Sequence, residues 1–276
     1  MTSPQTRPPT NSQTVQPARV TEDGAGRGAS AGPDRRPADD LVIAGLVPMS
    51  TVDWPDHLTA TVFLQGCPWN CFYCHNRDLI PVRTPGQVAW EEVRALLRRR
   101  RGLLDGVVLT GGEALRQDAL ADAAREVVDM GFQVGLHTAG PYPRRLRDMI
   151  EAGLVDWVGL DIKALPEHYG QVVGRANAAA RAWESLEVLV EAAGRGGPDF
   201  EVRTTVVPGD VTADDAVEVA RRVHAAGARV YALQQARSEG TSGEFDVVAP
   251  GWDGMCERMA ERIEALGWDR FTYRPA

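Results

Sequence analysis

From residue 41 onward, short runs of apolar residues alternate with longer stretches in which apolar residues recur every three or four positions. The short runs predict strands, and the spacing in the longer stretches predicts amphipathic helices. The strand-like runs are almost continuously apolar, which is typical of a parallel sheet covered by helices. The predicted strands are 61–65, 106–110, 133–137, 157–161, 200–207, 229–233 and 271–273. The predicted helices are 88–101, 117–130, 143–152, 177–193, 213–226 and 254–266.

Six strand–helix units are enough for most of a (β/α) barrel. We therefore predict an α/β fold, a partial (β/α)6-type TIM barrel, formed by residues 41–276. In parallel α/β folds, ligands bind beyond the carboxyl ends of the strands. The residues that follow each predicted strand are therefore the candidates for chemistry.

The first forty residues differ in composition from the rest. Residues 1–40 contain six prolines, no aromatic residue and no periodic apolar pattern. Such a segment cannot bury enough apolar surface to offset the entropy lost on ordering, so we predict a disordered tail. It also lacks the apolar core of about seven or more residues that a signal peptide requires.

The net charge and the hydropathy of the chain argue against two kinds of partner, nucleic acids and membranes. The net charge of −8 argues against a general nucleic-acid grip, which needs a basic surface. No stretch reaches the roughly eighteen apolar residues of a membrane span. We therefore expect a cytoplasmic protein without a nucleic-acid or membrane partner, in a reducing compartment that keeps its thiols free.

Three of the four cysteines, Cys67, Cys71 and Cys74, fall within eight positions after the first predicted strand. Three clustered cysteines cannot all pair, which disfavours a disulfide framework. Thiolates are soft ligands, and a cubane held by three of them keeps one iron free to bind and reduce a small molecule. A zinc site completed by His75 is the alternative. The remaining cysteine, Cys256, is predicted to be a packed helical residue.

The spacing Cys-x3-Cys-x2-Cys, with Tyr73 directly before the last cysteine, resembles the signature of the radical S-adenosylmethionine (SAM) enzymes. The resemblance implies that Cys67, Cys71 and Cys74 hold three irons of one 4Fe–4S cluster and that SAM chelates the fourth. It also implies that Tyr73, or its backbone, packs near the adenine. Packing in the protein core is the alternative for this aromatic ring.

Gly111, Gly112 and Glu113 follow the second predicted strand. Paired glycines let a backbone approach a ligand closely, and a carboxylate accepts hydrogen bonds from an ammonium group. A Gly-Gly-Glu sequence alone is most often a turn. One unit after the cysteines, however, it resembles the second motif of the radical SAM family, which implies that these three residues bind the methionine amino group of SAM.

Asp161 and Lys163 follow the fourth predicted strand, in a segment that resembles the glycyl-radical enzyme activases. The resemblance implies that the lysine approaches SAM and that the aspartate helps to bind a monovalent cation; a surface ion pair is the alternative. At the third strand those relatives commonly carry Asp-Thr, whereas this chain carries His137 and Thr138. Thr138 is a candidate site residue by this resemblance. Neutral imidazole is a poor ligand for Na⁺ or K⁺, so the cation stays an open expectation.

Arg203 lies in the fifth predicted strand, before a Val-Pro-Gly that related activases also carry. Its side chain is expected either to reach the SAM carboxylate or to point outward into a salt bridge. Gln235 follows the sixth strand, where it could hydrogen-bond the adenosyl group or simply finish the strand. Before the cysteines, residues 46–55 resemble the lead-in of the anaerobic ribonucleotide reductase activating proteins.

Together these likenesses cover nearly all of residues 41–276. They imply that the protein cleaves SAM reductively and uses the 5′-deoxyadenosyl radical to generate a glycyl radical on a partner enzyme. Anaerobic ribonucleoside-triphosphate reductase is the preferred partner, and a flavodoxin or ferredoxin is the expected electron donor. Two alternatives stay open: a radical SAM enzyme acting on a small molecule, similar to 7-carboxy-7-deazaguanine synthase, and a zinc-stabilised binding module.

Overall fold

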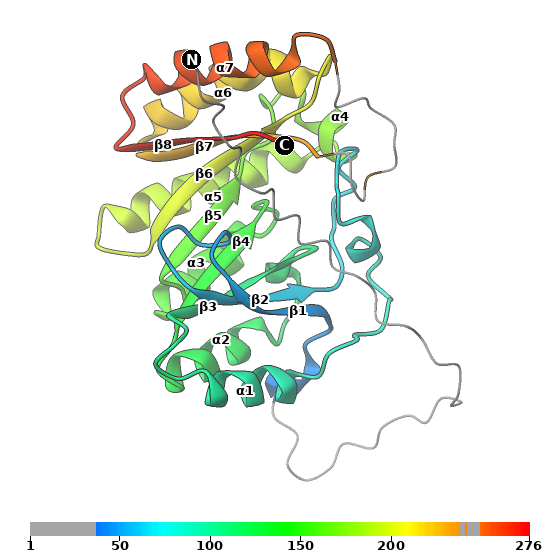
Figure 1. Cartoon of the computed structure of the whole chain (residues 1–276), viewed down its shortest axis with the longest axis vertical. Helices are drawn as coiled ribbons and strands as arrows, with labels where there is room; N and C mark the ends of the chain where they lie inside the picture. Colours follow the sequence, from blue (N-terminus) through cyan, green and yellow to red (C-terminus); the bar gives the residue numbers. More distant parts are fainter. Residues whose placement is uncertain (1–36, 238–240, 242–248) are drawn as a thin grey trace, which may run out of the picture. The chain divides into compact units, whose positions relative to one another are not determined.

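Eight strands form one sheet whose spatial order follows the sequence (Figure 1). The computed structural model describes residues 37–237, 241 and 249–276. The first two strands are antiparallel, and each later strand runs parallel to the one before it. The strands are β1 (Ile43–Ser50), β2 (Thr59–Leu64), β3 (Gly106–Gly111), β4 (Gln133–Thr138), β5 (Trp157–Asp161), β6 (Asp199–Val206), β7 (Val230–Gln235) and β8 (Arg270–Arg274).

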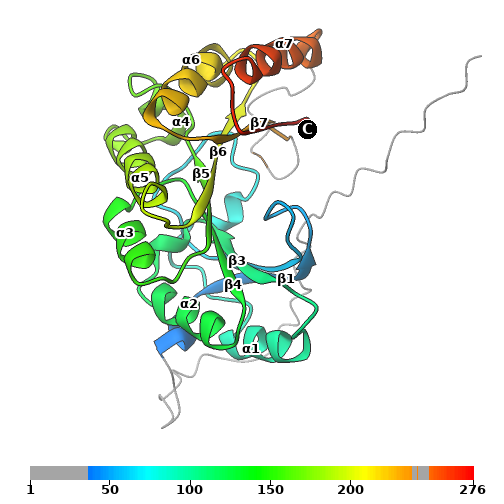
Figure 2. The same cartoon turned by 90° about the vertical axis from the view of Figure 1, so that its left-hand side faces the viewer.

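Helices connect the parallel strands, and α2, α3, α5 and α6 lie together on one side of the sheet (Figure 2). The α-helices are α1 (Trp90–Arg99), α2 (Leu120–Asp129), α3 (Pro143–Glu151), α4 (Tyr169–Val173), α5 (Ala178–Ala193), α6 (Val211–Ala226) and α7 (Trp252–Glu264). The 3-10 helices are η1 (Pro37–Asp40), η2 (Arg77–Leu79) and η3 (Ala114–Arg116). Within the described residues, no helix has both the length and the apolar composition to cross a membrane.

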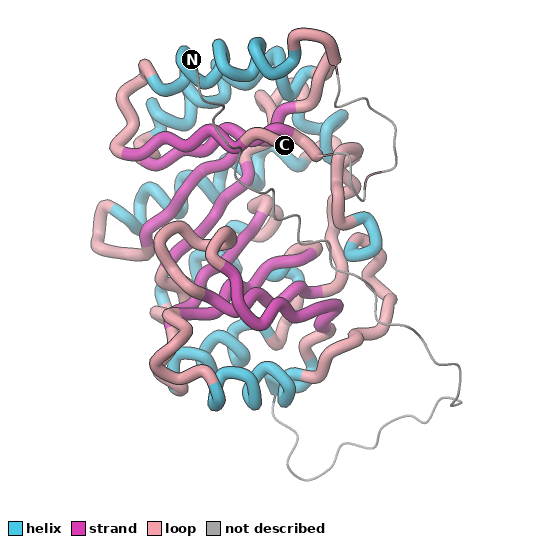
Figure 3. Tube along the Cα trace, in the orientation of Figure 1, coloured by secondary structure: helices cyan, strands magenta, loops and turns pink. Residues whose placement is uncertain are grey.

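The predicted α/β architecture is confirmed. Each of the strands β2 to β7 is followed by at least one helix, which gives the six predicted strand–helix units. The sheet is open, because β1 and β8 stand at its two ends and do not pair with each other. Figure 3 shows this arrangement by element type, with the strands in magenta and the helices in cyan.

The apolar pattern does not predict β1 or α4. Part of β1 is predicted only as a lead-in, since this strand contains Gly45 and Pro48, residues that weaken a strand pattern and are tolerated at a sheet edge. The five residues of α4 are too few for a helical period to be visible. Helix α4 supports the cysteine loop, and β1 pairs with β2, the strand that leads into it.

The folded part of the chain begins before residue 41, where the predicted tail was expected to end. Pro37–Asp40, which the prediction included in the tail, forms η1, in which Ala38 is fully buried. Asp39 of this helix pairs with the buried Arg94 of α1 at 2.6 Å. These four residues therefore belong with the folded unit, and the rest of the predicted tail, residues 1–36, lies outside the described residues.

The sheet face opposite the helices is covered by the connection between β1 and β2 (Figure 2). Trp54 in this connection packs with Val108 and Trp157 in a small apolar cluster, and its ring is stacked on Trp157 with centroids 5.6 Å apart. Gly135 makes room for it, because a Cβ there would lie 2.7 Å from the Trp54 ring. The indole therefore packs on β3, β4 and β5 on this face of the sheet.

Candidate functional site

The three clustered cysteines lie on the loop between β2 and α1. All three are partly exposed and none forms a disulfide. Burial raises the pKa of the Cys67 thiol to about 12, and the neighbouring charges of Glu113 and Cys71 add to the increase. Burial also raises the pKa of Cys71, and Cys74 contributes to that shift. Each thiol therefore lies within electrostatic range of the next.

The three thiols are candidate ligands of a metal centre. Across residues 37–237, 241 and 249–276, no three His, Cys, Asp or Glu side chains are arranged to hold a single metal ion. Each cysteine of a cubane binds a different iron, so three thiols on one loop can hold one such cluster. Three free thiols on one short loop are the donor set that such a cluster uses. The residues present therefore fit an iron–sulfur cluster.

The two ends of the cysteine loop are clamped together. Gln65 is 2% exposed, and its amide donates to the carbonyls of Asp78 at 2.9 Å and Pro81 at 2.8 Å. The Cys67 amide donates to the Ile80 carbonyl at 3.0 Å. The chain after β2 therefore lies against residues 78–81, which fixes the position of the first cysteine, Cys67.

Helix α4 supports the middle of the same loop. The Asn70 amide donates to the Val173 carbonyl at 3.0 Å, and the Phe72 amide donates to the Val172 carbonyl at 3.3 Å. These two amides flank Cys71 in the sequence. The carboxyl end of α4 therefore uses its free carbonyl groups to hold the central cysteine.

Gly111, the last residue of β3, and Gly112 after it are needed for packing against the end of β2 and the start of the cysteine loop. A Cβ on Gly111, which has φ of +112°, would lie 2.3 Å from the Leu64 nitrogen, and one on Gly112 would lie 2.5 Å from the Gly66 oxygen. The Glu113 amide then donates to the same Gly66 carbonyl at 2.9 Å. Here the glycines allow backbone to approach backbone, a reason different from the approach to a ligand that we expected.

Glu113 is buried and already has three hydrogen-bond donors. The Thr138 hydroxyl donates to its carboxylate at 2.8 Å, and the amides of Ala139 and Leu115 donate at 3.1 and 3.2 Å. Burial raises the pKa of Glu113 to about 7, against the opposing effect of these hydrogen bonds. Glu113 and Thr138 thus connect the carboxyl ends of β3 and β4, two of the places from which site residues were predicted.

Asp161 at the end of β5, Lys163 just after it and Arg203 in the middle of β6 form one charged group. Arg203 Nε lies 2.9 Å from Asp161 Oδ1, and Lys163 Nζ lies 3.2 Å from Asp161 Oδ2. Arg203 Nη2 also donates to the Gly159 carbonyl at 3.2 Å. Burial alone would raise the pKa of Asp161, but the charges of Arg203 and Lys163 outweigh it and hold the pKa below its usual range. Arg203 therefore points across the sheet, not outward.

Tyr73 links this charged group to the cysteine loop. Lys163 Nζ lies 5.5 Å from the centroid of the Tyr73 ring, close enough for a cation–π contact. Tyr73 is 7% exposed, and within the part of the chain that the structure describes its hydroxyl oxygen is buried without a hydrogen-bond partner. A buried unpartnered hydroxyl is costly, so a polar ligand atom at this point would stabilise the site.

His137 has partners for both of its ring nitrogens. Its Nε2 lies 2.7 Å from the Asp53 carbonyl oxygen, and its Nδ1 lies 3.3 Å from the Thr110 hydroxyl. Burial, followed by the charge of Arg203, lowers the pKa of His137 to about 3. The imidazole is therefore neutral, and it ties β4 to the connection that carries Trp54.

Gln235 is not brought to this group. Its amide donates to the Tyr273 hydroxyl at 2.8 Å and contacts Asp253 of α7 at 3.3 Å, and its oxygen accepts from the Ala276 amide at 3.0 Å. These contacts place its side chain toward α7 and the end of the chain. The predicted hydrogen bond from Gln235 to an adenosyl group is therefore not supported, and the alternative, a strand-end residue, describes it. Cys256 is fully buried, as predicted.

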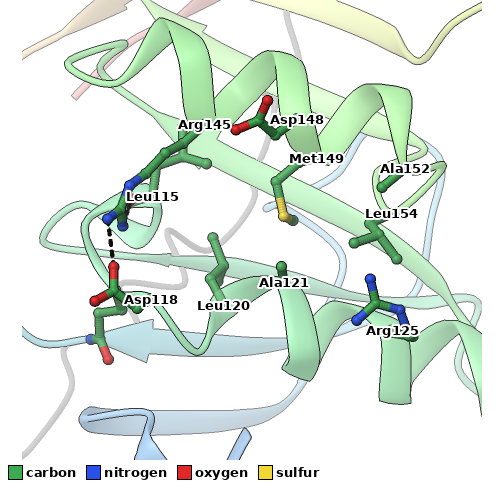
Figure 4. Close-up of a pocket in the computed structure, with 11 residues that line it drawn as sticks. Leu115, Asp118, Leu120, Ala121, Arg125, Arg145, Asp148, Met149, Ala152 and Leu154 are labelled. Carbon is green, nitrogen blue, oxygen red and sulfur yellow. Dashed lines mark hydrogen bonds and ion pairs between the residues drawn. The ribbon is translucent and has the colours of Figure 1, made fainter. Parts of the chain in front are cut away.

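A groove of about 420 Å³ lies elsewhere, on the outer side of the sheet between α2 and α3 (Figure 4). Leu120, Met149 and Leu154 line it, and an ion pair between Arg145 and Asp118 borders it. It contains none of the predicted site residues. The chemistry at the strand ends and this groove are therefore separate features.

Comparison with known proteins agrees with this chemistry. The model of the radical SAM superfamily matches residues 61–223. A Methanocaldococcus jannaschii protein assigned by name to the glycyl-radical enzyme activating enzymes is 28% identical over 198 residues, which cover 70% of this chain and 79% of that protein. The pyruvate formate-lyase 1-activating enzyme of Escherichia coli K12 is 33% identical over 135 residues, which cover 46% of this chain and 54% of the enzyme.

Solved structures share the fold. Streptococcus suis SuiB bound to S-adenosylmethionine superimposes with a TM-score of 0.56 at 9% identity, over 76% of this chain and 48% of SuiB. At this identity the likeness concerns the fold alone. The sequence matches span most of the archaeal relative but about half of the bacterial one.

Proposed function

The chain belongs to the radical SAM superfamily, and from this membership we propose that it is a glycyl-radical enzyme activating enzyme. The observation that carries the proposal is the likeness to the archaeal relative of that name, which extends over 79% of its length. Two further supports are the match to a pyruvate formate-lyase activating enzyme and the activase-like segment around Asp161 and Lys163.

The superfamily uses a 4Fe–4S cluster and SAM. We assign Cys67, Cys71 and Cys74 as the ligands of that cluster, because they are the free thiols on the loop at the carboxyl end of β2. When bound, the cluster supplies the low-potential electron that cleaves SAM to a 5′-deoxyadenosyl radical. We expect a flavodoxin or ferredoxin to deliver that electron.

The charged group at β5 and β6 suits the carboxylate end of SAM. Arg203 and Lys163 each carry one positive charge, and Asp161 balances only one of them. A buried surplus of positive charge stabilises an anionic group. We therefore propose that Arg203 and Lys163 orient the SAM carboxylate and that the unpartnered Tyr73 hydroxyl donates to a polar atom of the ligand.

The residues at β3 and β4 have a positioning role in this proposal. Gly111 and Gly112 let the end of β3 pack on the cysteine loop, and Glu113 joins it to Thr138 of β4. We propose that these four residues hold the site for the methionine end of SAM. Direct acceptance of the SAM ammonium by Glu113 would use the hydrogen-bonding capacity that its three present donors leave.

We propose an anaerobic ribonucleoside-triphosphate reductase as the partner. The resemblance of residues 46–55 to the lead-in of that enzyme's activating proteins supports this choice. The open sheet supports a protein substrate, since β1 and β8 leave the sheet unclosed and a partner's loop can enter. The chain also has only Cys256 beyond the three cluster ligands, too few for a second cysteine-ligated cluster.

The proposal is tested by mixing the reduced, cluster-loaded protein with SAM and a candidate anaerobic ribonucleotide reductase. We expect a glycine-centred doublet in the electron paramagnetic resonance spectrum of the partner. SAM cleavage without a doublet on any glycyl radical enzyme, together with turnover of a purine-like small molecule, would instead assign the protein to the small-molecule branch of the superfamily.

A further inference from the structure

We propose that Arg203 and Lys163 take the place of a monovalent cation at β5 and β6, so that SAM binding by this protein requires neither Na⁺ nor K⁺. The inference rests on the proposed function, because it concerns how the SAM site is charged. It differs from the expectation that Asp161 helps to bind such a cation. The residues around Asp161 do not fit that role.

Both oxygens of Asp161 already face a cation of the protein. Arg203 Nε contacts Oδ1 at 2.9 Å, and Lys163 Nζ contacts Oδ2 at 3.2 Å. The side chains of Arg203 and Lys163 are only 10% and 9% exposed, so water screens their charges weakly. A third cation at contact distance from Asp161 would be repelled by both of them.

The neighbouring strand offers no second carboxylate. The side chain that β4 presents here is His137, and its Nε2 lies 2.7 Å from the Asp53 carbonyl oxygen. A carbonyl can only accept, so Nε2 carries the hydrogen, and Nδ1 is left to accept from the Thr110 hydroxyl. The imidazole thus has no free lone pair, and an alkali cation prefers oxygen ligands in any case.

The next oxygen along the chain is also engaged. The Thr138 hydroxyl donates to Glu113 at 2.8 Å and accepts from the Gly140 amide at 3.0 Å. With His137 neutral, the group formed by Asp161, Lys163 and Arg203 keeps one net positive charge. At Asp161 itself, the two adjacent positive charges disfavour a third cation.

Arg203 and Lys163 would therefore supply a permanent positive charge opposite the SAM carboxylate. A bound cation enters and leaves with the salt composition, whereas a guanidinium and an ammonium on the chain are always present at neutral pH. The affinity for SAM should therefore depend on total ionic strength but not on which monovalent cation provides it.

Thallium(I), a probe for K⁺ sites, tests the inference directly. The anaerobically reconstituted full chain is dialysed against thallium(I) with and without SAM, and the SAM Kd is measured in choline, sodium and potassium salts at equal ionic strength. We expect no saturable thallium(I) and a Kd that stays within about twofold across the salts. About one thallium(I) per chain, displaced by K⁺, or a Kd about tenfold lower in K⁺ than in choline, would overturn the inference.

A pair of variants gives the matched control. His137→Asp places a second carboxylate beside the site and is expected to introduce saturable thallium(I) binding, whereas the uncharged His137→Asn is not. A folded His137→Asp protein that still binds no thallium(I) would contradict the claim that His137 prevents cation binding at this site. If SAM fails to bind in every salt, the proposed function fails, while the thallium(I) dialysis without SAM still decides whether a cation site exists.

Discussion

The two sides of the site are held by different forces. The cysteine loop, at the end of β2, is fixed mainly by backbone hydrogen bonds to η2, β3 and α4, such as those from Cys67, Asn70 and Phe72. The group at β5 and β6 is fixed by the charges of Asp161, Lys163 and Arg203. Backbone support leaves the cysteine side chains free for a metal, whereas the charged side chains hold one another and, in our proposal, also bind SAM.

This difference predicts how each side responds to substitution. On the loop, removing a thiol should remove chemistry with little effect on the fold, because backbone hydrogen bonds, not the thiols, hold the loop in place. In the charged group, removing one side chain should disturb the fold and SAM binding together, because the remaining charges lose their partner.

The largest expected effect is on activity. Cys71→Ala should abolish both cluster retention and SAM cleavage, because a cubane needs all three thiolates. The melting temperature of the cluster-free protein should change little. Iron content, SAM cleavage and thermal unfolding measure the three quantities, and a variant that still cleaves SAM after reconstitution would contradict the assignment of Cys71.

The next effect is on stability. Asp161→Asn leaves Arg203 and Lys163 without their counter-charge, and breaking a buried pair costs about 3–5 kcal/mol. Because the Asp161 side chain is 31% exposed, we expect about 3 kcal/mol, the low end of that range. Urea unfolding of the cluster-free protein measures it. A loss of unfolding free energy below about 1 kcal/mol, the usual contribution of a surface ion pair, would show that this group is only a surface ion pair.

On the side of the cysteine loop, we expect the fold to be sensitive to substitution of Gly112. Gly112→Ala places a Cβ 2.5 Å from the Gly66 oxygen, so the backbone must move. We expect a loss of about 1–3 kcal/mol, the usual cost of overpacking, and slower cluster assembly. Gly254→Ala in α7 is the control, because the nearest atom to its Cβ is a side-chain nitrogen of Arg258 at 3.4 Å. Equal effects of the two substitutions would contradict the packing role of Gly112.

The last effect is a pH dependence from Glu113. Its pKa rises from 4.5 to about 7 on folding, so between these values the folded protein binds more protons than the unfolded chain. Glu113 therefore makes the free energy of unfolding fall as pH rises from about 4.5 to 7. The cluster-free wild type and Glu113→Gln are unfolded across this range. The difference between their stabilities should decrease with pH, and a constant difference would contradict a raised pKa.

Much of this architecture could be predicted from the sequence. The six strand–helix units follow from near-continuous apolar strands, and adjacent strands bring Glu113 to Thr138 and Asp161 to Arg203, as a parallel sheet requires. The cysteine motif is local, so its spacing alone indicates its chemistry.

The supports of the site could not be predicted. In the sequence, Gln65 looks like the polar end of a strand. Its contacts with Asp78 and Pro81 depend on the path of the cysteine loop, which the sequence does not show. Trp54 lies outside any periodic segment, and only the fold brings it onto Gly135. The direction of the Gln235 side chain could not be predicted either, since a polar residue at a strand end can face either side of the sheet and here it contacts Asp253 of α7.

One measurement tests the central claim most directly. The full chain is purified and reconstituted without oxygen, and its iron, sulfide and zinc contents are determined beside those of Cys71→Ala. A cubane held by Cys67, Cys71 and Cys74 predicts about four irons and four sulfides per chain in the wild type and their loss in the variant. One zinc per chain with no sulfide would contradict the account.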